Sequence, residues 1–298
     1  MDVSQVIAAI NWVTQHAHDP GLNIRVLSLS YGTKSTQSYL LDPLAYAAEQ
    51  AWRKGIFVVV AGGNDGATDT SGLADPAMDP LLMAVGADDP NGTVAVTDDF
   101  VPTFATHGTN TRHVDVVAPA VHVLGLRVPG SYVDTNNPNA AVGSRFIRGS
   151  GTSQATAFVA GAAAVVLQKY PSMTPNVLKS SLMLGAVPMS GSSATYRGSG
   201  LINIANSLAA GGSNANQSAT ASTGTGSLEA SRGGAHVVNS ATGVELRGEY
   251  DAFGKPWNAP AWAAAVAKDA SWVGGAHPTS GGVRLRVNLT IRLRGLLL

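Results

Sequence analysis

The sequence predicts an α/β fold, with a mainly parallel β-sheet covered by helices on both faces. The first observation is the continuous apolar run Ile-Phe-Val-Val-Val-Ala at residues 56–61. Such a run, rich in β-branched residues, is typical of a strand buried on both sides. The second observation is that predicted strands alternate with predicted helices. This order favours parallel strands joined by helical crossovers.

The predicted elements begin at the amino end of the chain. Apolar residues recur at helical spacing over residues 2–17, which predicts an amphipathic helix, and a strand follows at 24–30. Asp42 followed by Pro43 is typical of a helix start, and Gly55 is typical of a helix end. Further strands are predicted at 81–86, 93–96, 114–117 and 121–126, and further helices at 152–169, 175–184 and 202–210.

The composition changes after residue 210, which ends the predicted α/β domain 1–210. Residues 211–226 are mostly Gly, Ser, Asn, Ala and Thr and carry no charge, so they predict a flexible linker. Residues 227–298 are expected to form a small β-rich appendage or a poorly ordered tail. We expect its tryptophans to form a core rather than a binding surface; they are Trp257, Trp262 and Trp272. The alternation of Arg with Leu and Val in 283–298 fits either a basic edge strand or a frame-shifted tail.

Charge and composition exclude several classes of partner. The 19 basic and 19 acidic residues give a formal net charge of zero, which argues against a nucleic-acid or membrane-surface partner. There is no cysteine, so disulfides and thiolate metal sites are excluded, and no metal site or cofactor is predicted. The first four residues lack the features of a signal peptide, and the apolar stretch 158–167 is too short to cross a bilayer.

The polar segment 127–148 is predicted to be a long loop. It contains Pro129, Gly130 and a cluster of asparagines at 136–139. Loops of this length near a site often carry substrate contacts. A surface insertion without a function is the equally weighted alternative.

A serine at the start of a predicted helix is the first candidate for chemistry. Ser153 lies in the run Gly-Ser-Gly-Thr-Ser-Gln-Ala-Thr-Ala at 149–157, and an apolar helix follows. At a helix start, free backbone N–H groups and the helix dipole can stabilise an oxyanion beside the hydroxyl. An ordinary helix start capped by Thr152 or Ser153 explains the same residues.

An asparagine at the end of a predicted strand is the second candidate. Asn64 follows the strand 56–61 and the residues Gly62 and Gly63, at the sheet edge where open α/β sheets bind ligands. Its amide can donate a hydrogen bond to an oxyanion. The alternative is a simple Asn-Asp-Gly turn.

Four motifs in the same order resemble those of the subtilisin-like serine proteases. The family's G-T-S-M-A-S-P-H-V-A-G is similar to Gly-Thr-Ser-Gln-Ala-Thr-Ala-Phe-Val-Ala-Gly at 151–161, and its A-A-G-N-x-G to Ala-Gly-Gly-Asn-Asp-Gly at 61–66. Leu-Ser-Tyr-Gly at 29–32 resembles the strand beside the primary specificity pocket. Val-Asp-Val-Val-Ala-Pro at 114–119 resembles D-V-x-A-P-G, with Ala120 in place of the glycine. Gln154, Ala157 and Phe158 depart from the family pattern.

The resemblance implies a subtilisin-like fold over residues 1–210 and a serine endopeptidase that acts on proteins or peptides outside the cell or at its surface. Ser153 is then the nucleophile, and Asn64 and the Ser153 N–H hold the oxyanion. The residues implied to bind the substrate are Ser30, Tyr31, Gly32, Ala61, Gly62, Gly63 and Ser150. No cofactor is implied.

The family's catalytic Asp and His motifs are not found. In subtilisin, Asp and His precede Ser along the chain, and here both would have to precede the strand at 24–30. Asp2, His16 and His18 are of the right type by position, but both histidines are expected at the solvated end of the first helix. His107-Gly-Thr-Asn imitates the histidine motif but comes after Asn64.

We therefore expect a chain that starts after the second triad residue and is inactive by itself. Its partner would include the missing N-terminal part of its own domain. A non-catalytic domain that binds peptides, derived from such a protease, is the alternative. A serine esterase of the α/β-hydrolase type is disfavoured, because that fold needs an acid and then a histidine after the serine. His236 and His277, the histidines that follow Ser153, both lie beyond the predicted linker.

Overall fold

The computed structural model describes residues 1–66, 72–212, 217–239 and 242–269, together with the backbone of 289–290. Its centre is a parallel sheet with the strand order β1-β2-β3-β4. The strands are β1 (Val26–Leu29), β2 (Phe57–Ala61), β3 (Met83–Asp88) and β4 (Val116–Pro119). The predicted α/β class is confirmed.

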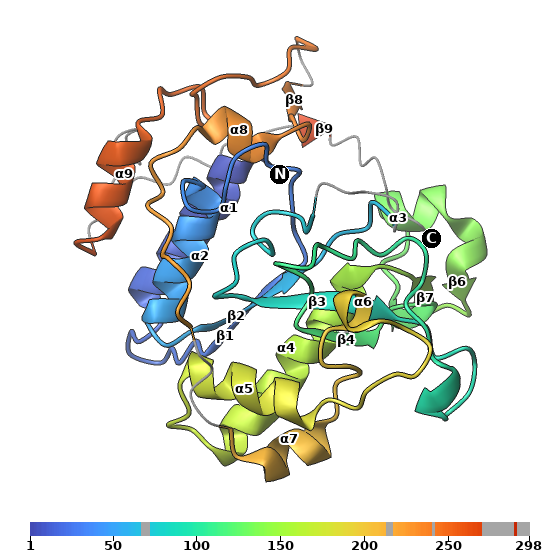
Figure 1. Ribbon diagram of the computed structural model, residues 1–298. Helices are drawn as coiled ribbons and strands as arrows, with labels where there is room; N and C mark the ends of the chain where they lie inside the picture. The colour runs from blue at the N-terminus through green and yellow to red at the C-terminus, as the bar shows by residue number, and fades with distance from the viewer. Residues whose placement is uncertain (67–71, 213–216, 240–241, 270–288, 291–298) are drawn as a thin grey trace.

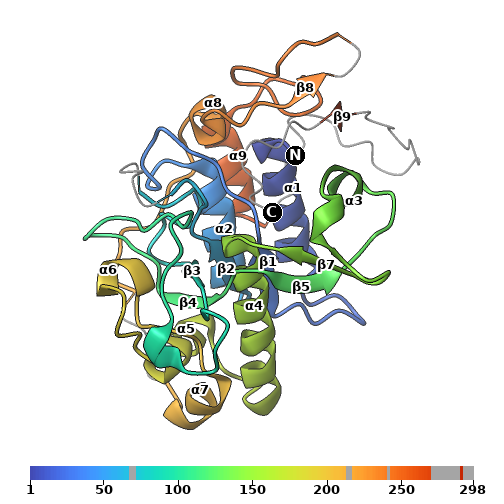
Figure 2. The ribbon, with the colours of Figure 1, turned by 90° about the vertical axis from the view of Figure 1, so that its right-hand side faces the viewer.

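Helices cover both faces of this sheet. The helix α4 (Thr152–Lys169) contacts all four strands, whereas α2 (Pro43–Arg53) packs against β2 and against α1 (Val3–His16). Figures 1 and 2 show α1 and α2 on one side of the sheet and α4 on the other. The helices α5 (Pro175–Gly185) and α7 (Ile204–Ala210) pack on each other, and the short α6 spans Ala194–Arg197. Every residue of β2 and β3 is buried as a result.

The helix starts follow from local chemistry. Asp2 caps α1, accepts a hydrogen bond from the Ser4 N–H and forms a capping box with Gln5. Asp42 caps α2 and is followed by Pro43 at the first helical position. These caps explain why the sequence located both helices to within two residues.

The strand β1 forms one edge of the central sheet. Within the described part of the chain, it pairs with β2 alone. Val26 and Leu27 are half-buried and Ser28 is exposed, in contrast to the fully buried β2. The sheet is therefore open along β1, beside the site described below.

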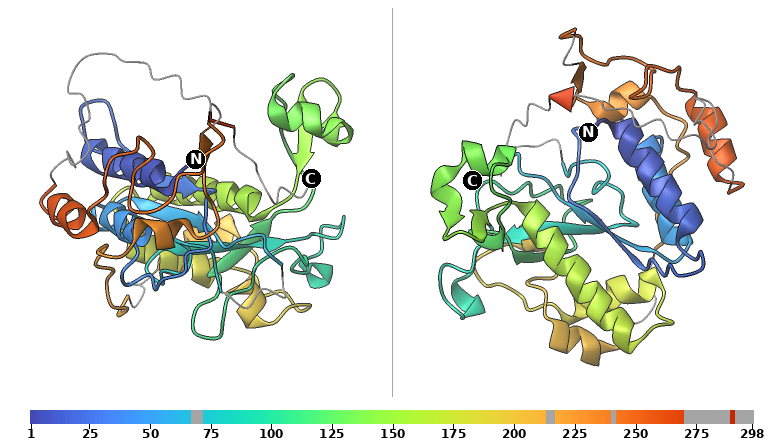
Figure 3. Two further views of the ribbon diagram at one scale, coloured as in Figure 1. Left: turned by 90° about the horizontal axis from the view of Figure 1, so that it is seen from above. Right: turned by 180° about the vertical axis from the view of Figure 1, so that it is seen from behind.

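The segment 123–149 forms a small antiparallel sheet, which we call the tab. It consists of β5 (Val123–Leu126), β7 (Phe146–Gly149) and β6 (Ala141–Val142), in that spatial order. The helix α3 (Tyr132–Asn136) and the 3₁₀ turn η2 (Pro138–Ala140) complete it. Figure 3 shows the tab standing out from the body of the molecule. The expectation of a long loop over 127–148 is therefore wrong, because helix, 3₁₀ and strand residues together occupy most of this segment.

The strand expected at 93–96 is also absent from the structure. A turn and the 3₁₀ helix η1 (Val96–Asp98) occupy this place. The Thr93 hydroxyl donates to Asp98 and accepts from the Ala95 N–H, so local side-chain bonds replace a strand ladder.

Residues 217–226, expected to belong to a flexible linker, are held against the helices by hydrogen bonds. The Ser222 N–H donates to Glu49 Oε1 at 2.7 Å. The Thr223 N–H donates to Leu40 O, and the Gly226 N–H donates to Leu41 O. This strap, residues 217–226, is polar in composition but ordered by its backbone.

The chain beyond the strap packs on the outer side of α1 and α2. It contains α8 (Leu228–Arg232), α9 (Ala259–Val266) and the two-residue strands β8 (Val238–Asn239) and β9 (Leu289–Thr290). Its regular structure is thus mostly helical, with little strand, unlike the β-rich appendage expected. Trp257 and Trp262 are buried in the main core, as expected, whereas Trp272 and nearly all of 283–298 lie outside the described residues. Among the described helices, none is long and apolar enough to span a membrane.

Candidate active site

The two segments that the sequence singles out meet at the carboxyl end of β2. Asn64 Oδ1 accepts hydrogen bonds from the Thr152 N–H at 2.9 Å and from Thr152 Oγ1 at 3.0 Å. The Gly63 N–H lies 3.3 Å from Thr152 Oγ1. Residues almost ninety positions apart in the sequence are therefore joined directly, next to Ser153.

These bonds fix which end of the Asn64 amide is available. Thr152 occupies the carbonyl oxygen, and among the described residues the amide nitrogen Nδ2 is left as the donor end without a partner. A side-chain carbon added at Gly151 would lie 3.3 Å from that nitrogen, and Gly151 has a φ of 151°. A residue with a side chain would thus crowd the amide and strain the backbone. Glycine at this position keeps the donor accessible.

Ser153 is the second residue of α4 and is half-buried. A backbone N–H in the first turn has no partner within the helix, and the positive end of the helix dipole lies there. The Ser153 carbonyl accepts a hydrogen bond from Ser30 Oγ at 2.9 Å. This bond ties the end of β1 to the start of α4.

The residues proposed to bind substrate lie around this junction. Gly62 donates to Val85 O and accepts from Ala74, so it is built into the sheet edge with Ala61 and Gly63. Gly32 lies close to Ala74, since an added side-chain carbon would come within 2.9 Å of the Ala74 Cβ. Both segments therefore border the same strand end.

Tyr31 and Ser150 differ in how their hydroxyl groups are bonded. The Tyr31 hydroxyl is buried and has no hydrogen-bond partner among the described residues, and burial raises its pKa. The Ser150 hydroxyl accepts a hydrogen bond from the His122 N–H at 3.0 Å. Ser150 thus ties the base of the tab to the loop that leads to Ser153.

The described residues place neither a histidine nor a carboxylate in hydrogen-bond contact with the Ser153 hydroxyl. His16 pairs with Asp19 at 2.6 Å, and His18 lies near the Lys54 carbonyl, both on the surface. Asp2 caps α1 and pairs with Arg232, which is equally buried. These three residues therefore have structural roles in this chain.

His107 is likewise separate from Ser153. Its ring is buried against Tyr196, with ring centroids 3.7 Å apart, and its two nitrogens have no hydrogen-bond partner within the described chain. Burial lowers the pKa of His107, which keeps the ring neutral. The neighbouring Thr106 accepts a bond from the Asp65 N–H, so this loop supports the Asn64 turn by packing.

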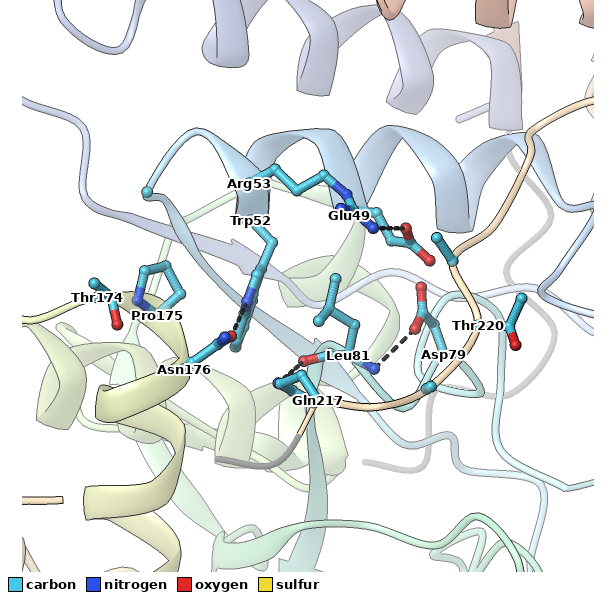
Figure 4. A pocket seen from close by; sticks show the side chains of 13 residues that line it. Glu49, Trp52, Arg53, Asp79, Leu81, Thr174, Pro175, Asn176, Gln217 and Thr220 are labelled. Atoms are coloured by element: carbon cyan, nitrogen blue, oxygen red, sulfur yellow. Dashed lines mark hydrogen bonds and ion pairs between the residues drawn. The ribbon is translucent and has the colours of Figure 1, made fainter. Parts of the chain in front are cut away.

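A second cluster of titratable groups lies in a cavity of about 350 Å³ between α2 and the start of α5. Figure 4 shows the carboxyl groups of Glu49 and Asp79 turned toward each other in this cavity. Burial, and then the Glu49 charge, raise the pKa of Asp79 to about 8. Arg53 and the strap residue Ser222 bind Glu49. Since neither Ser153 nor Asn64 lines this cavity, we regard it as a structural site.

Thr152 is the residue at this junction whose contacts the sequence left undefined. Its hydroxyl and N–H hold Asn64, whereas the motif suggested only a helix cap. The sequence does show a threonine directly before Ser153. It does not show that the hydroxyl of this threonine bonds to Asn64, because that contact depends on the tertiary fold.

Comparison with known proteins gives the same family as the motifs. The subtilase family model matches residues 1–200. The serine protease AprX of Bacillus subtilis is 35% identical over 212 residues, which are 69% of this chain and 48% of that protein. Subtilisin DY of Bacillus licheniformis is 31% identical over 202 residues, 67% of this chain and 61% of that protein. The chain thus spans about half to three fifths of the length of these relatives.

Solved structures show the same fold. MycP1 without its N-terminal propeptide is similar with a TM-score of 0.50 and 25% identity, covering 70% of this chain and 68% of that chain. The prenylagaramide maturation protease PagA has a TM-score of 0.50 and 24% identity, with 67% of this chain and 66% of that chain covered. These structures share the fold, and the family model that matches residues 1–200 shows that the chain belongs to the subtilase family.

Proposed function

We propose that this chain carries the nucleophile and the oxyanion site of a serine endopeptidase that cleaves proteins or peptides. The observation that carries the proposal is the pair of hydrogen bonds from Thr152 to Asn64 Oδ1, which turn the amide nitrogen of Asn64 away from Thr152, near Gly151. An ordinary helix cap does not need an asparagine from another strand. An oxyanion site needs such a donor, held in place before the reaction.

In the proposed reaction the Ser153 hydroxyl attacks the peptide carbonyl. The carbonyl oxygen becomes negative, and Asn64 Nδ2 and the Ser153 N–H donate to it. A donor of this kind lowers the barrier by about 3–4 kcal/mol, because its dipole is already oriented in a site with little water. Backbone at Ser30–Gly32 and Ala61–Gly63 would hold an extended substrate on either side.

The proposed reaction also needs a general base. The described residues offer no base to Ser153, and we propose that the chain by itself is close to inactive. A base from another segment, such as an N-terminal part of the same domain, would approach along β1, where Ser28 and Ser30 are exposed. The missing base is also what favours the alternative, a non-catalytic domain that binds peptides.

Hydrolysis of a peptide p-nitroanilide, with and without added imidazole, tests the proposal. We expect turnover near background without imidazole, since loss of a triad member leaves only about 10³–10⁴-fold catalysis over water. Imidazole should raise the rate in the natural chain and not in Ser153→Ala. The matched control is Ser144→Ala, at an exposed serine of the tab. High turnover without imidazole would overturn the claim of a missing base, and an equal imidazole effect in Ser153→Ala would overturn the assigned nucleophile.

We further propose an extracellular or cell-surface location. The support is similarity: a relative from Thermus sp. with 31% identity over 185 residues is named an extracellular serine proteinase. Fractionation of cells that express the natural gene tests the location, and recovery from the cytosol alone would contradict it.

A further inference from the structure

We propose that the outer face of the tab is an exosite that binds an acidic, apolar segment of the protein substrate. The inference rests on the proposed function, because it assigns a second contact to the same substrate. The tab leads directly into the proposed nucleophile: β7 ends at Gly149, four residues before Ser153.

The strand register gathers large apolar side chains on one face of the tab. Leu124 is paired with Arg148, and Leu126 is paired with Phe146. Directly paired residues in antiparallel strands point to the same side, as do residues two apart along one strand. All four side chains therefore share one face, and Val142, paired with Phe146, extends it.

That face is exposed, which is unusual for its composition. Leu124, Leu126 and Phe146 are exposed to 55%, 75% and 40%. The opposite face has half-buried Val123 and Ile147, with glycines between them. A sheet normally buries its apolar face. A contiguous exposed apolar face, on a sheet that leads into the candidate site, is a mark of an interaction surface.

The charges of the tab determine the chemistry of the partner. Arg148 lies on the apolar face, and Arg145 stacks over the Phe146 ring at 5.9 Å. Neither arginine has a carboxylate partner among the described residues. The acid of the tab, Asp134, is already used by Arg127, with Nη2 to Oδ2 at 3.2 Å. The surface is thus apolar and basic, and it complements a segment with apolar and acidic side chains.

The tab is also built to present this face in one orientation. Asp134 accepts from the Gly130 N–H at 2.9 Å as well as from Arg127, which closes the loop between β5 and α3. At the other end, the His122–Ser150 bond and the bond from the Gly151 N–H to Ala120 O fasten the tab to the site. An ordered surface loses less entropy when it binds a partner than a mobile loop would.

Fluorescence anisotropy with labelled twelve-residue peptides tests the exosite without requiring catalysis. The probe alternates Leu or Phe with Asp, and matched peptides replace Asp by Lys or by Ser. We expect the acidic probe to bind the natural chain more tightly than the Ser peptide and the Lys peptide to bind least. Arg148→Glu should weaken binding of the acidic probe by about fivefold or more, because it turns an attraction into a repulsion. Leu126→Ser should weaken all three peptides.

Lys169→Glu is the matched control. It makes the same charge change at the far end of α4, and it should leave binding unchanged. Circular dichroism of each variant confirms that it folds. Equal binding of the three peptides, or no effect of Arg148→Glu in a folded protein, would overturn the exosite.

Two other occupants of this face are distinguished by the same variants. If the protein binds vesicles of anionic phospholipid but not the peptides, the occupant of this face is a membrane. If the protein forms dimers that Leu126→Ser disrupts, the occupant is a second copy of the chain. Either result overturns the proposal. Because these assays measure binding alone, they separate failure of the exosite from failure of the proposed hydrolysis, which the imidazole assay measures.

Discussion

Asn64 shows how neighbouring groups decide what one side chain can do. In a simple turn its amide would bond to its own loop, but Thr152 takes the carbonyl oxygen with two donors. The nitrogen end lies near Gly151, and we propose that it is the donor to the oxyanion. The type and place of the residue follow from the sequence, and its orientation comes from the fold.

Asp79 gives a prediction at the same scale. Its folded-state pKa is raised to about 8, first by burial and then by Glu49. In the unfolded chain the pKa is about 3.9. Between these values the folded state keeps a proton that the unfolded state releases, so stability falls as the pH rises from about 4 to about 8.

Asp79→Asn should reduce this loss, because the amide is uncharged and can still accept from the Leu81 N–H. We expect the natural chain to lose more stability than the variant between pH 5 and pH 8, by up to about 1.4 kcal/mol per pH unit. Urea unfolding at pH 5, 6.5 and 8 measures this change. Asp98→Asn, at an exposed carboxylate, is the control. If the free energy of unfolding depends on pH in the same way in both variants, Asp79 is not the source of the pH dependence.

At the scale of elements, Lys179 joins α5 to the start of β3 and to the segment before β4. Its ammonium lies 2.7 Å from Pro80 O, 2.8 Å from Leu82 O and 3.3 Å from the carboxylate of Asp115. The side chain is only 5% exposed. Arg112 also binds Asp115.

Lys179→Met keeps the length of the side chain but removes its charge. The Asp115 carboxylate and the carbonyls would lose a partner inside the protein. We expect a loss of about 3–5 kcal/mol in the free energy of unfolding, as for other broken buried pairs. Lys169→Met, at an exposed lysine, should change it by about 0.5 kcal/mol or less. Denaturant unfolding measures both, and a loss below about 1 kcal/mol for Lys179→Met would contradict a structural role for the pair.

The elements that the sequence located share strong local signals. The run at 56–61 has no polar residue, and Asp42 with Pro43 fixes a helix start. The tab lacked such a signal, because the pairing of β5 with β7 spans twenty residues of polar chain. The strand expected at 93–96 does not form, because hydrogen bonds of the Thr93 hydroxyl replace the backbone hydrogen bonds of a strand pair. Pairing between distant segments is a tertiary property, so apolar periodicity did not reveal it.

At the scale of the whole molecule, residues 227–239 and 242–269 pack on the same body as the parallel sheet. Arg232 and Asp2, which are 230 positions apart in the sequence, form a fully buried pair with Nε to Oδ2 at 2.7 Å. Trp262 lies edge-on to Tyr46 of α2. The composition predicted a flexible linker followed by a separate unit. Composition alone does not reveal the hydrogen bonds that the backbone of the strap makes, so this prediction missed the order of the strap.

We therefore expect one cooperative unfolding transition that includes the C-terminal helices. Arg232→Met should cost about 3–5 kcal/mol, because it leaves the Asp2 carboxylate buried without its partner. The double variant Asp2→Asn with Arg232→Met should recover part of that loss. Tryptophan fluorescence and circular dichroism during unfolding measure the number of transitions and the free energy of unfolding of each variant. Two separate transitions, or strictly additive effects of the two substitutions, would contradict a single body.

The most direct test of the central claim is acylation of Ser153 by an activated ester, followed by mass spectrometry. A p-nitrophenyl ester needs little help from a base, so it reports on the serine and the oxyanion site alone. Asn64→Asp is the matched variant, since it keeps an oxygen for Thr152 and replaces the donor nitrogen by an oxygen. The account predicts an acyl group on Ser153 and a rate about 10²–10³-fold lower in Asn64→Asp. An acyl group on other residues alone, or an equal rate in both proteins, would contradict it.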